Sequence, residues 1–269
     1  MRARANPDSL PGDVLGHCIN VVAAGAALLG AGWIRRRVSR ERLPEPARLR
    51  WLAAGVAVLV GGSGLLRALA QGPVHVTGGL RLLGLALAGL ILGNLTGRAL
   101  GLQRRLDAWG RSLARPAVTP GPSTDSRRAD FCLGVLLALN PLVIPASIQD
   151  ALEGRWTGLA LKSALDAATL LSWAAGRLEG ASSGLSPAGV ARLVGPVAVW
   201  QAAWTGAAAA AAGALATRGL STPLMLATDL LILCSAPAIA GIRGTPQANL
   251  LPTLLWMPIL HGWMRGTTP

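Results

Sequence analysis

The sequence predicts an all-α fold, a polytopic bundle of about seven or eight transmembrane helices in a single integral membrane domain over residues 1–269. Hydrophobic residues make up 52% of the chain, whereas charged residues make up only 14%. The apolar residues gather in runs of about 20, the length that a helix needs to cross a hydrocarbon core about 30 Å thick. Arginines gather between these runs, as in the short cytoplasmic loops of membrane proteins.

The first half of the domain, residues 12–100, contains three predicted spans at 12–33, 51–69 and 78–100. Arginine-rich stretches follow the first and the third of these spans. If all three segments cross the bilayer, both stretches lie on one side, and the positive-inside rule identifies that side as the cytoplasm. The amino terminus then lies outside. Tryptophan supplies the interface anchors, because the chain has nine tryptophans and no tyrosine.

A flexible basic linker is expected over residues 101–130, because its second part is rich in Pro, Ser, Gly and charge. The second half, residues 131–265, begins with the apolar run 131–148, which contains Asn140-Pro141 and Pro145. Proline lacks the amide donor and clashes with the preceding turn, so a helix here should kink or break. In a membrane, the freed backbone groups must find partners within the protein or in a wet cavity.

The remaining predicted spans are 156–175, 190–216, 222–242 and 249–263. The alanine-rich run 190–216 is suited to close helix packing, within the chain or against a second copy in a homo-oligomer. A count of seven spans results if the run 131–148 is re-entrant, and a count of eight if it crosses.

Residues 51–69 and 224–241 show weak self-similarity, and each is followed by a short loop and another span. With eight crossings the two halves would have opposite topology, the inverted repeat with broken helices that is common in secondary transporters. Chance is the alternative explanation, since small apolar residues match one another easily.

Lys162, the only lysine of the chain, precedes Asp166 by four residues within the predicted span 156–175. This spacing places both side chains on one face of a helix. A charge inside a bilayer costs several kcal/mol on insertion scales, so the pair should face the bundle interior. Two interpretations follow: the pair forms a wall of a substrate or ion path, or it neutralises itself and only holds helices together.

Asp229 is a second carboxylate inside a predicted span, and no basic residue lies within one turn of it. Such a carboxylate takes up a proton, binds a cation or pairs with a distant arginine. The alternative is a carboxylate near a helix start, stabilised by the helix dipole and by Thr222 or Thr228.

Uncharged polar side chains and a polar turn complete the candidate substrate or ion site. Gln149 and Asp150 follow the proline-broken run, where transporter sites are often built from free amides and carbonyls. Asn20 and Asn249 add amides to the first and last predicted spans. Each of these residues alone is more often a hydrogen-bonding contact between helices, or part of a solvated loop, than a ligand contact.

Several other function classes have no support in the sequence. The net charge of +13 would suggest nucleic-acid binding in a soluble protein, but here the arginines act as topology determinants in contact with the lipid bilayer. The three cysteines and three histidines are scattered, so no metal site, disulfide framework or cofactor is predicted. No nucleophile or nucleotide motif is present in a suitable context, so the chain is not predicted to be an enzyme.

The run SIQDALEGRWTGLALKSALDAATLLSWA resembles the central signature of the YqgA/YdfK-type bacterial membrane proteins, a family of unknown function (domain of unknown function 554). INVVAAGAALLGAGW near the start and GIRGTPQANLLPTLLWMP near the end resemble two further elements of that family. The resemblance implies a multi-pass protein of the bacterial inner membrane. The residues that match the family pattern are Asn20, Gln149, Asp150, Lys162, Asp166, Asn249 and Pro252.

The chain departs from this family pattern at two places. Asn94 stands where the family tends to have an acidic residue, and Asp229-Leu230 stands where it usually has Gly-Gly. Asp229 is therefore expected to be particular to this chain.

From these observations we expect a small secondary transporter or channel for a small solute or ion. Its polar site would be formed by the broken fourth run, by Lys162 and Asp166, and by amides of the first and last spans. The alternative is a non-transporting membrane scaffold or partner subunit whose Lys162–Asp166 pair is purely structural. A water-accessible cavity at the pair would favour transport, and a dry, tightly packed pair would favour the scaffold.

Overall fold

The computed structural model describes residues 46–71, 76–118, 123–177, 187–242 and 245–266, together with Val22 and Ala26. The described chain is all-helical, as predicted. The first predicted span, 12–33, lies outside these residues apart from two positions. The helices are α2 (Pro46–Gln71), α3 (Val76–Ala99), α4 (Leu102–Val118), α5 (Ser123–Ala138), α6 (Val143–Glu153), α7 (Thr157–Arg177), α8 (Pro187–Thr217), α9 (Ser221–Ile239), α10 (Gln247–Leu250) and α11 (Thr253–Gly266).

Three of the described helices are long and apolar enough to cross a membrane, at Arg50–Ala68, Arg81–Ala99 and Ser221–Ile239. A fourth crossing results if the bent pair Ala129–Ala138 and Val143–Glu153 is counted as one span. By their length and composition, these helices indicate a membrane protein. The predicted spans 156–175 and 190–216 form α7 and α8, which are long enough to cross a membrane but less apolar than these helices. The predicted span 249–263 forms parts of α10 and α11, and α11 has only 14 residues.

The fourth predicted run is broken where the sequence predicts it. Helix α5 ends at Ala138 and α6 begins at Val143, and the two are bent by 57°. The side chain of Asn140 accepts a hydrogen bond from the backbone N–H of Leu142, so it partners one of the amides freed at the break. The result is a separate short helix, α6, in the interior of the molecule.

The prediction of a flexible linker over residues 101–130 is not confirmed. Residues 102–118 form α4 and residues 123–130 form the first turns of α5. Leu102, Leu106 and Leu113 recur at helical spacing, and Leu106 and Leu113 are half-buried while Arg104 and Arg105 are exposed. This amphipathic pattern outweighs Pro116, which falls near the end of α4.

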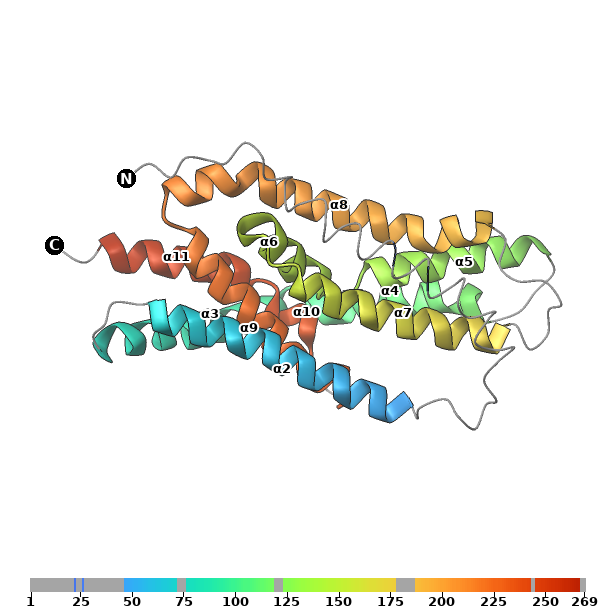
Figure 1. Ribbon diagram of the computed structural model, residues 1–269, viewed down its shortest axis with the longest axis horizontal. Helices are drawn as coiled ribbons and strands as arrows, with labels where there is room; N and C mark the ends of the chain where they lie inside the picture. Colours follow the sequence, from blue (N-terminus) through green and yellow to red (C-terminus); the bar gives the residue numbers. More distant parts are fainter. Residues whose placement is uncertain are drawn as a thin grey trace.

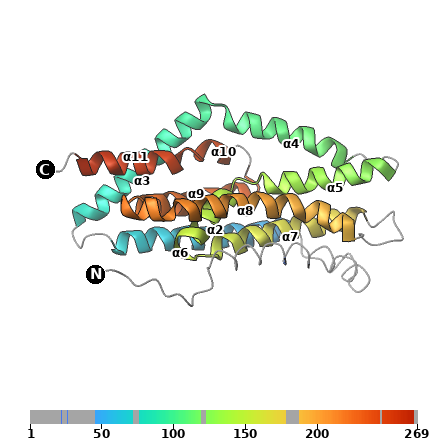
Figure 2. The ribbon, with the colours of Figure 1, turned by 90° about the horizontal axis from the view of Figure 1, so that it is seen from above.

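Helix α9 is central to the packing of the bundle. Its buried side chains contribute to two of the three hydrophobic clusters, one shared with α2 and α7 and the other with α3 and α11. Figure 1 shows α8 along one long edge of the molecule and α2 along the opposite edge, with α6 and α9 between them. Figure 2 shows α3 and α4 meeting at an angle, at a turn in which Gly101 has a φ of 63°.

Glycines allow the closest helix contacts in the bundle. A Cβ at Gly61 of α2 would lie 2.6 Å from the backbone oxygen of Asp229 on α9, and one at Gly97 of α3 would lie 2.1 Å from the backbone oxygen of Asn249. Helix α2 therefore packs directly on α9, and α3 packs directly on the segment leading into α11. These are the pairs of helices that the weak self-similarity relates, and the inverted repeat itself stays a prediction.

Candidate functional site

The first charged pair is carried by one helix. Lys162 and Asp166 lie one turn apart on α7, and the Lys162 ammonium group donates a hydrogen bond to Asp166 Oδ2. The two side chains are 0% and 2% exposed. The sequence prediction that this pair faces the interior is confirmed in its geometry.

Buried leucines precede and follow this pair on the same helix. Leu159, Leu161 and Leu170 of the same helix are buried, and the hydroxyl of Ser163 donates to the backbone oxygen of Leu159 within the helix. Lys162 and Asp166 therefore neutralise each other's charge in the interior, which limits their desolvation cost.

The second charged pair joins segments that are distant in the sequence. Arg155, in the connection between α6 and α7, donates from its two terminal nitrogens to the carboxylate of Asp229 on α9, over 3.2 Å to Oδ2 and 3.0 Å to Oδ1. Gln149 of α6 donates its amide to Asp229 Oδ1 over 2.6 Å. Asp229 thus has three donors from outside its own helix, so the expectation of a distant arginine is the alternative that the structure supports.

Gly64 of α2 creates the space that the Asp229 carboxylate occupies. A Cβ at this position would lie only 2.1 Å from both the Cγ and the Oδ1 of Asp229. On the other side, a Cβ at Gly158 of α7 would lie 3.0 Å from Gln149 Oε1. Two glycines on different helices therefore fix the positions of the two interacting side chains.

The end of α6 determines where Arg155 lies. Gly154 caps the helix in the left-handed conformation with a φ of 64°, and its N–H donates to the backbone oxygen of Asp150. The N–H of Arg155 donates to the backbone oxygen of Gln149 over 3.3 Å. The bond from Gly154 to Asp150 is that of the αL capping motif, and the turn places Arg155 within reach of Asp229 on α9.

Arg155 also faces a second carboxylate and the solvent. Its guanidinium lies 3.5 Å from Glu153, whose side chain is 46% exposed, while the Arg155 side chain is 15% exposed and that of Asp229 is 3% exposed. Burial acts to lower the pKa of Arg155, but hydrogen bonds and charge interactions with Asp229 and Glu153 raise it above its usual value. Arg155 therefore connects a buried carboxylate with an exposed one.

The other predicted site residues are only partly brought together. Asp150 is buried on α6, one residue after Gln149. Asn249 lies at the contact of α10 with α4, where its Oδ1 accepts from the N–H of Gln103 over 3.0 Å. This contact is separate from both charged pairs, and Asn20 lies outside the described residues.

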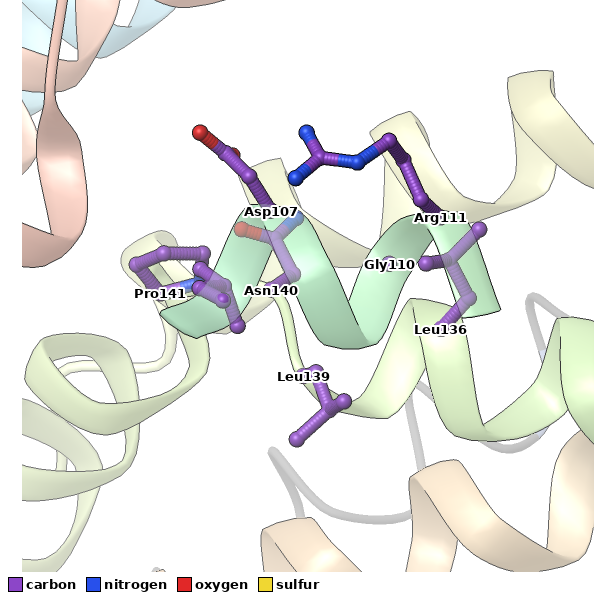
Figure 3. Close-up of a pocket in the computed structure, with 8 residues that line it drawn as sticks. Asp107, Gly110, Arg111, Leu136, Leu139, Asn140 and Pro141 are labelled. Carbon is purple, nitrogen blue, oxygen red and sulfur yellow. The ribbon is translucent and has the colours of Figure 1, made fainter. Parts of the chain in front are cut away.

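Two pockets in the described part of the chain are lined by residues other than Lys162, Asp166 and Asp229. The larger, of about 340 Å³, is a groove between α4 and α5 beside the break at Asn140-Pro141. Figure 3 shows Asp107 and Arg111 projecting from the same face of α4 at this groove. The side chains of Lys162 and Asp166 are buried, whereas the Arg155 side chain of the second pair is 15% exposed.

Within the described residues, no group of three or more His, Cys, Asp or Glu side chains could hold a metal ion. The side chains of the two pairs can neutralise one another, and a carboxylate of either pair can bind a cation in place of its present partner. Sequence reasoning missed Arg155 as a site residue, and the available signal was the unpaired carboxylate of Asp229 itself, which required some cationic partner.

Comparison with known proteins identifies the family of the chain. The model of the family described as "Protein of unknown function (DUF554)" matches residues 15–261, so the chain belongs to this family. The chain matches no curated protein and no solved structure.

Proposed function

We propose that this member of a family of unknown function carries a small solute or ion across the bacterial inner membrane. The observation that supports the proposal is the Asp229 carboxylate, which lies midway along a candidate membrane span and is held there by Arg155 and Gln149. Ionisable groups at such depth are costly, and in membrane proteins they mark ion or substrate pathways.

The break between α5 and α6 supports the same proposal. Helix α6 is short, and it carries Gln149 and Asp150, both buried, together with the turn that positions Arg155. Discontinuous helices of this kind supply polar groups at membrane depth in transporters. A short helix between two bends can also shift relative to α9 without breaking a long hydrogen-bonded ladder.

The Lys162–Asp166 pair takes a secondary place in this proposal. Both side chains are buried, with 0% and 2% exposure, and neither lines one of the two pockets. We assign the pair the role of holding α7 in place, beside the ion-handling role of the Asp229 carboxylate. The proposal requires the lipid bilayer and a small solute or ion as partners and assigns the chain no catalytic step.

The burial of Lys162 and Asp166 as a mutual pair also favours a second candidate function. A non-transporting membrane scaffold or partner subunit would need buried ion pairs only to specify how its helices pack. Under that function, both charged pairs are structural and no solute moves.

Flux through purified protein in liposomes tests the proposal. Currents on a solid-supported membrane are recorded with a panel of monovalent cations, small organic anions and amino acids. We expect a solute-dependent current in the wild type that Asp229→Asn abolishes. A matched control, Gly62→Ala on α2, should keep the current, because a Cβ at Gly62 would meet nothing within 4 Å. An absence of current with every solute would support the scaffold instead.

A further inference from the structure

Arg155 is placed between two carboxylates of different exposure. Its guanidinium hydrogen-bonds the buried Asp229 through both terminal nitrogens, and it lies 3.5 Å from the half-exposed Glu153. We propose that Asp229 is a binding site for a small cation, either a proton or an alkali-metal ion, and that Arg155 occupies it as a built-in substitute until the cation arrives. This inference rests on the proposed function and names the ion that the site handles.

The exchange keeps the buried site neutral in both of its states. In the first state the Asp229 carboxylate is paired with Arg155. In the second the cation neutralises Asp229, and Arg155 pairs with Glu153 nearer the solvent. A buried charge without a partner is strongly unfavourable, so a site that always holds one cation can change occupants without passing through a stable unpaired state.

Only the Arg155 side chain needs to move in this exchange. The Arg155 backbone is held by the hydrogen bond from its N–H to Gln149, directly after the left-handed cap at Gly154. The Asp229 carboxylate is confined by Gly64 of α2, where even a methyl group would collide with it. The guanidinium stands at the end of a flexible chain of methylenes and can turn from one carboxylate to the other.

The groups around Asp229 suit a small cation. Departure of Arg155 frees Oδ2 and part of Oδ1, while Gln149 stays within hydrogen-bond distance. The Gln149 Oε1 atom is buried and has no hydrogen-bond partner in the described part of the chain, so rotation of this amide would offer a third oxygen. Among the described residues, the charged groups that act on Asp229 are Arg155 and Glu153, and α2 faces it with glycines.

The partial exposure of Arg155 gives the cation a way in. The Arg155 side chain is 15% exposed, whereas that of Asp229 is 3% exposed, so the guanidinium separates the carboxylate from water. Movement of this one side chain toward Glu153 would open Asp229 on that side. Arg155 therefore acts as a gate as well as a substitute ion.

Chemical modification of Arg155 tests the exchange without any knowledge of a transported solute. Purified full-length protein in detergent is treated with phenylglyoxal, which modifies accessible guanidinium groups, and the modified residues are quantified by mass spectrometry. The exposed Arg104 serves as an internal reference for reagent reactivity. The ratio of Arg155 to Arg104 modification is measured in choline chloride, in sodium or potassium chloride at the same ionic strength, and at neutral and mildly acidic pH.

We expect the ratio to rise several-fold in the presence of the cation that the site binds. A rise with sodium or potassium at constant pH identifies an alkali-metal ion, and a rise on acidification alone identifies the proton. Asp229→Asn should give a high ratio in every buffer, because Arg155 then lacks its buried partner. Glu153→Gln should diminish the cation-dependent rise, because the released guanidinium has lost its second partner.

The exchange is refuted if the modification ratio of the wild type does not change with any cation or with pH. It is also refuted if the cation-dependent rise is as large in Glu153→Gln as in the wild type. If Asp229→Asn does not fold, the ratios of the wild type and of Glu153→Gln still test the exchange, because Glu153 is half-exposed and its substitution should not disturb folding. If solute flux is observed but the modification ratio does not change, the exchange is refuted and the transport proposal is kept. A cation-dependent ratio without flux supports the exchange and counts against transport.

Discussion

The two charged pairs of this molecule differ in how they are built and in what surrounds them. Lys162 and Asp166 belong to one helix, four residues apart, and both are fully enclosed by packed side chains. Arg155 and Asp229 are 74 residues apart and meet where the end of α6 reaches α9, with Arg155 in partial contact with solvent. The second pair has an alternative partner in Glu153.

This difference separates a structural ion pair from an exchangeable one. Opening a fully buried pair places uncompensated charges in the interior, so we expect the Lys162–Asp166 pair to hold α7 in a fixed packing. A pair with a neighbouring exposed carboxylate can exchange at lower cost. The same chemistry, a cation beside a carboxylate, therefore predicts opposite behaviour in the two regions.

The largest expected effect is the loss of one partner of the enclosed pair. Lys162→Met leaves Asp166 buried without a counter-charge, and we expect the free energy of unfolding to fall by about 3–5 kcal/mol. The double variant with Lys162→Met and Asp166→Leu should be close to the wild type, because no charge then stays buried. Thermal or denaturant unfolding in detergent measures both, and an equal loss in the single and double variants would refute a self-neutralising pair.

A smaller effect is expected from a methyl group placed against the exchangeable pair. Gly64→Ala forces the Asp229 carboxylate away from Arg155, and we expect a loss of about 1–3 kcal/mol in the free energy of unfolding. Gly62→Ala, two residues away on the same helix, should be neutral or slightly stabilising, since its Cβ would meet nothing within 4 Å. Equal stability of the two variants in the same unfolding assay would show that Gly64 does not confine Asp229.

A milder change tests the two-pronged contact of Arg155 with Asp229. Arg155→Lys keeps the charge but can make only one close hydrogen bond to the carboxylate, so we expect a loss of about 1–2 kcal/mol. Arg155→Met should lose more, because it leaves Asp229 without a cation. If the lysine and methionine variants unfold alike, the charge of Arg155 contributes nothing to the fold.

The smallest effect is expected at Glu153. Its contact with Arg155 is half-exposed and 3.5 Å long, so Glu153→Gln should change the free energy of unfolding by less than about 1 kcal/mol. A clearly larger loss in the unfolding assay would make Glu153 a structural partner of Arg155 and would weaken the comparison of the two pairs.

Local features of the fold could be predicted from the sequence, whereas features that depend on packing could not. The spacing of Lys162 and Asp166 and the break at Asn140-Pro141 follow from helix geometry and from proline, and the structure contains both. Helix α4 was missed because the composition of residues 101–130 concealed the helical spacing of its leucines.

The Arg155–Asp229 contact lay beyond sequence reasoning for a physical reason. It depends on the left-handed turn at Gly154 and on the close approach of α2 to α9 at Gly64. Neither feature has a signature in the residues next to Asp229. The sequence could state only that this carboxylate needed a partner, and a distant arginine was one of several alternatives.

The most direct test compares the accessibility of the two cations in one sample. Lys162 is the only lysine, so an amine reagent applied to the protein in liposomes reports on this side chain and the amino terminus alone, while phenylglyoxal reports on Arg155. With the bound cation supplied, we predict that Arg155 becomes modified and Lys162 stays protected. Modification of Lys162 as readily as of Arg155, or protection of both under every condition, would contradict the distinction between an enclosed pair and an exchangeable one.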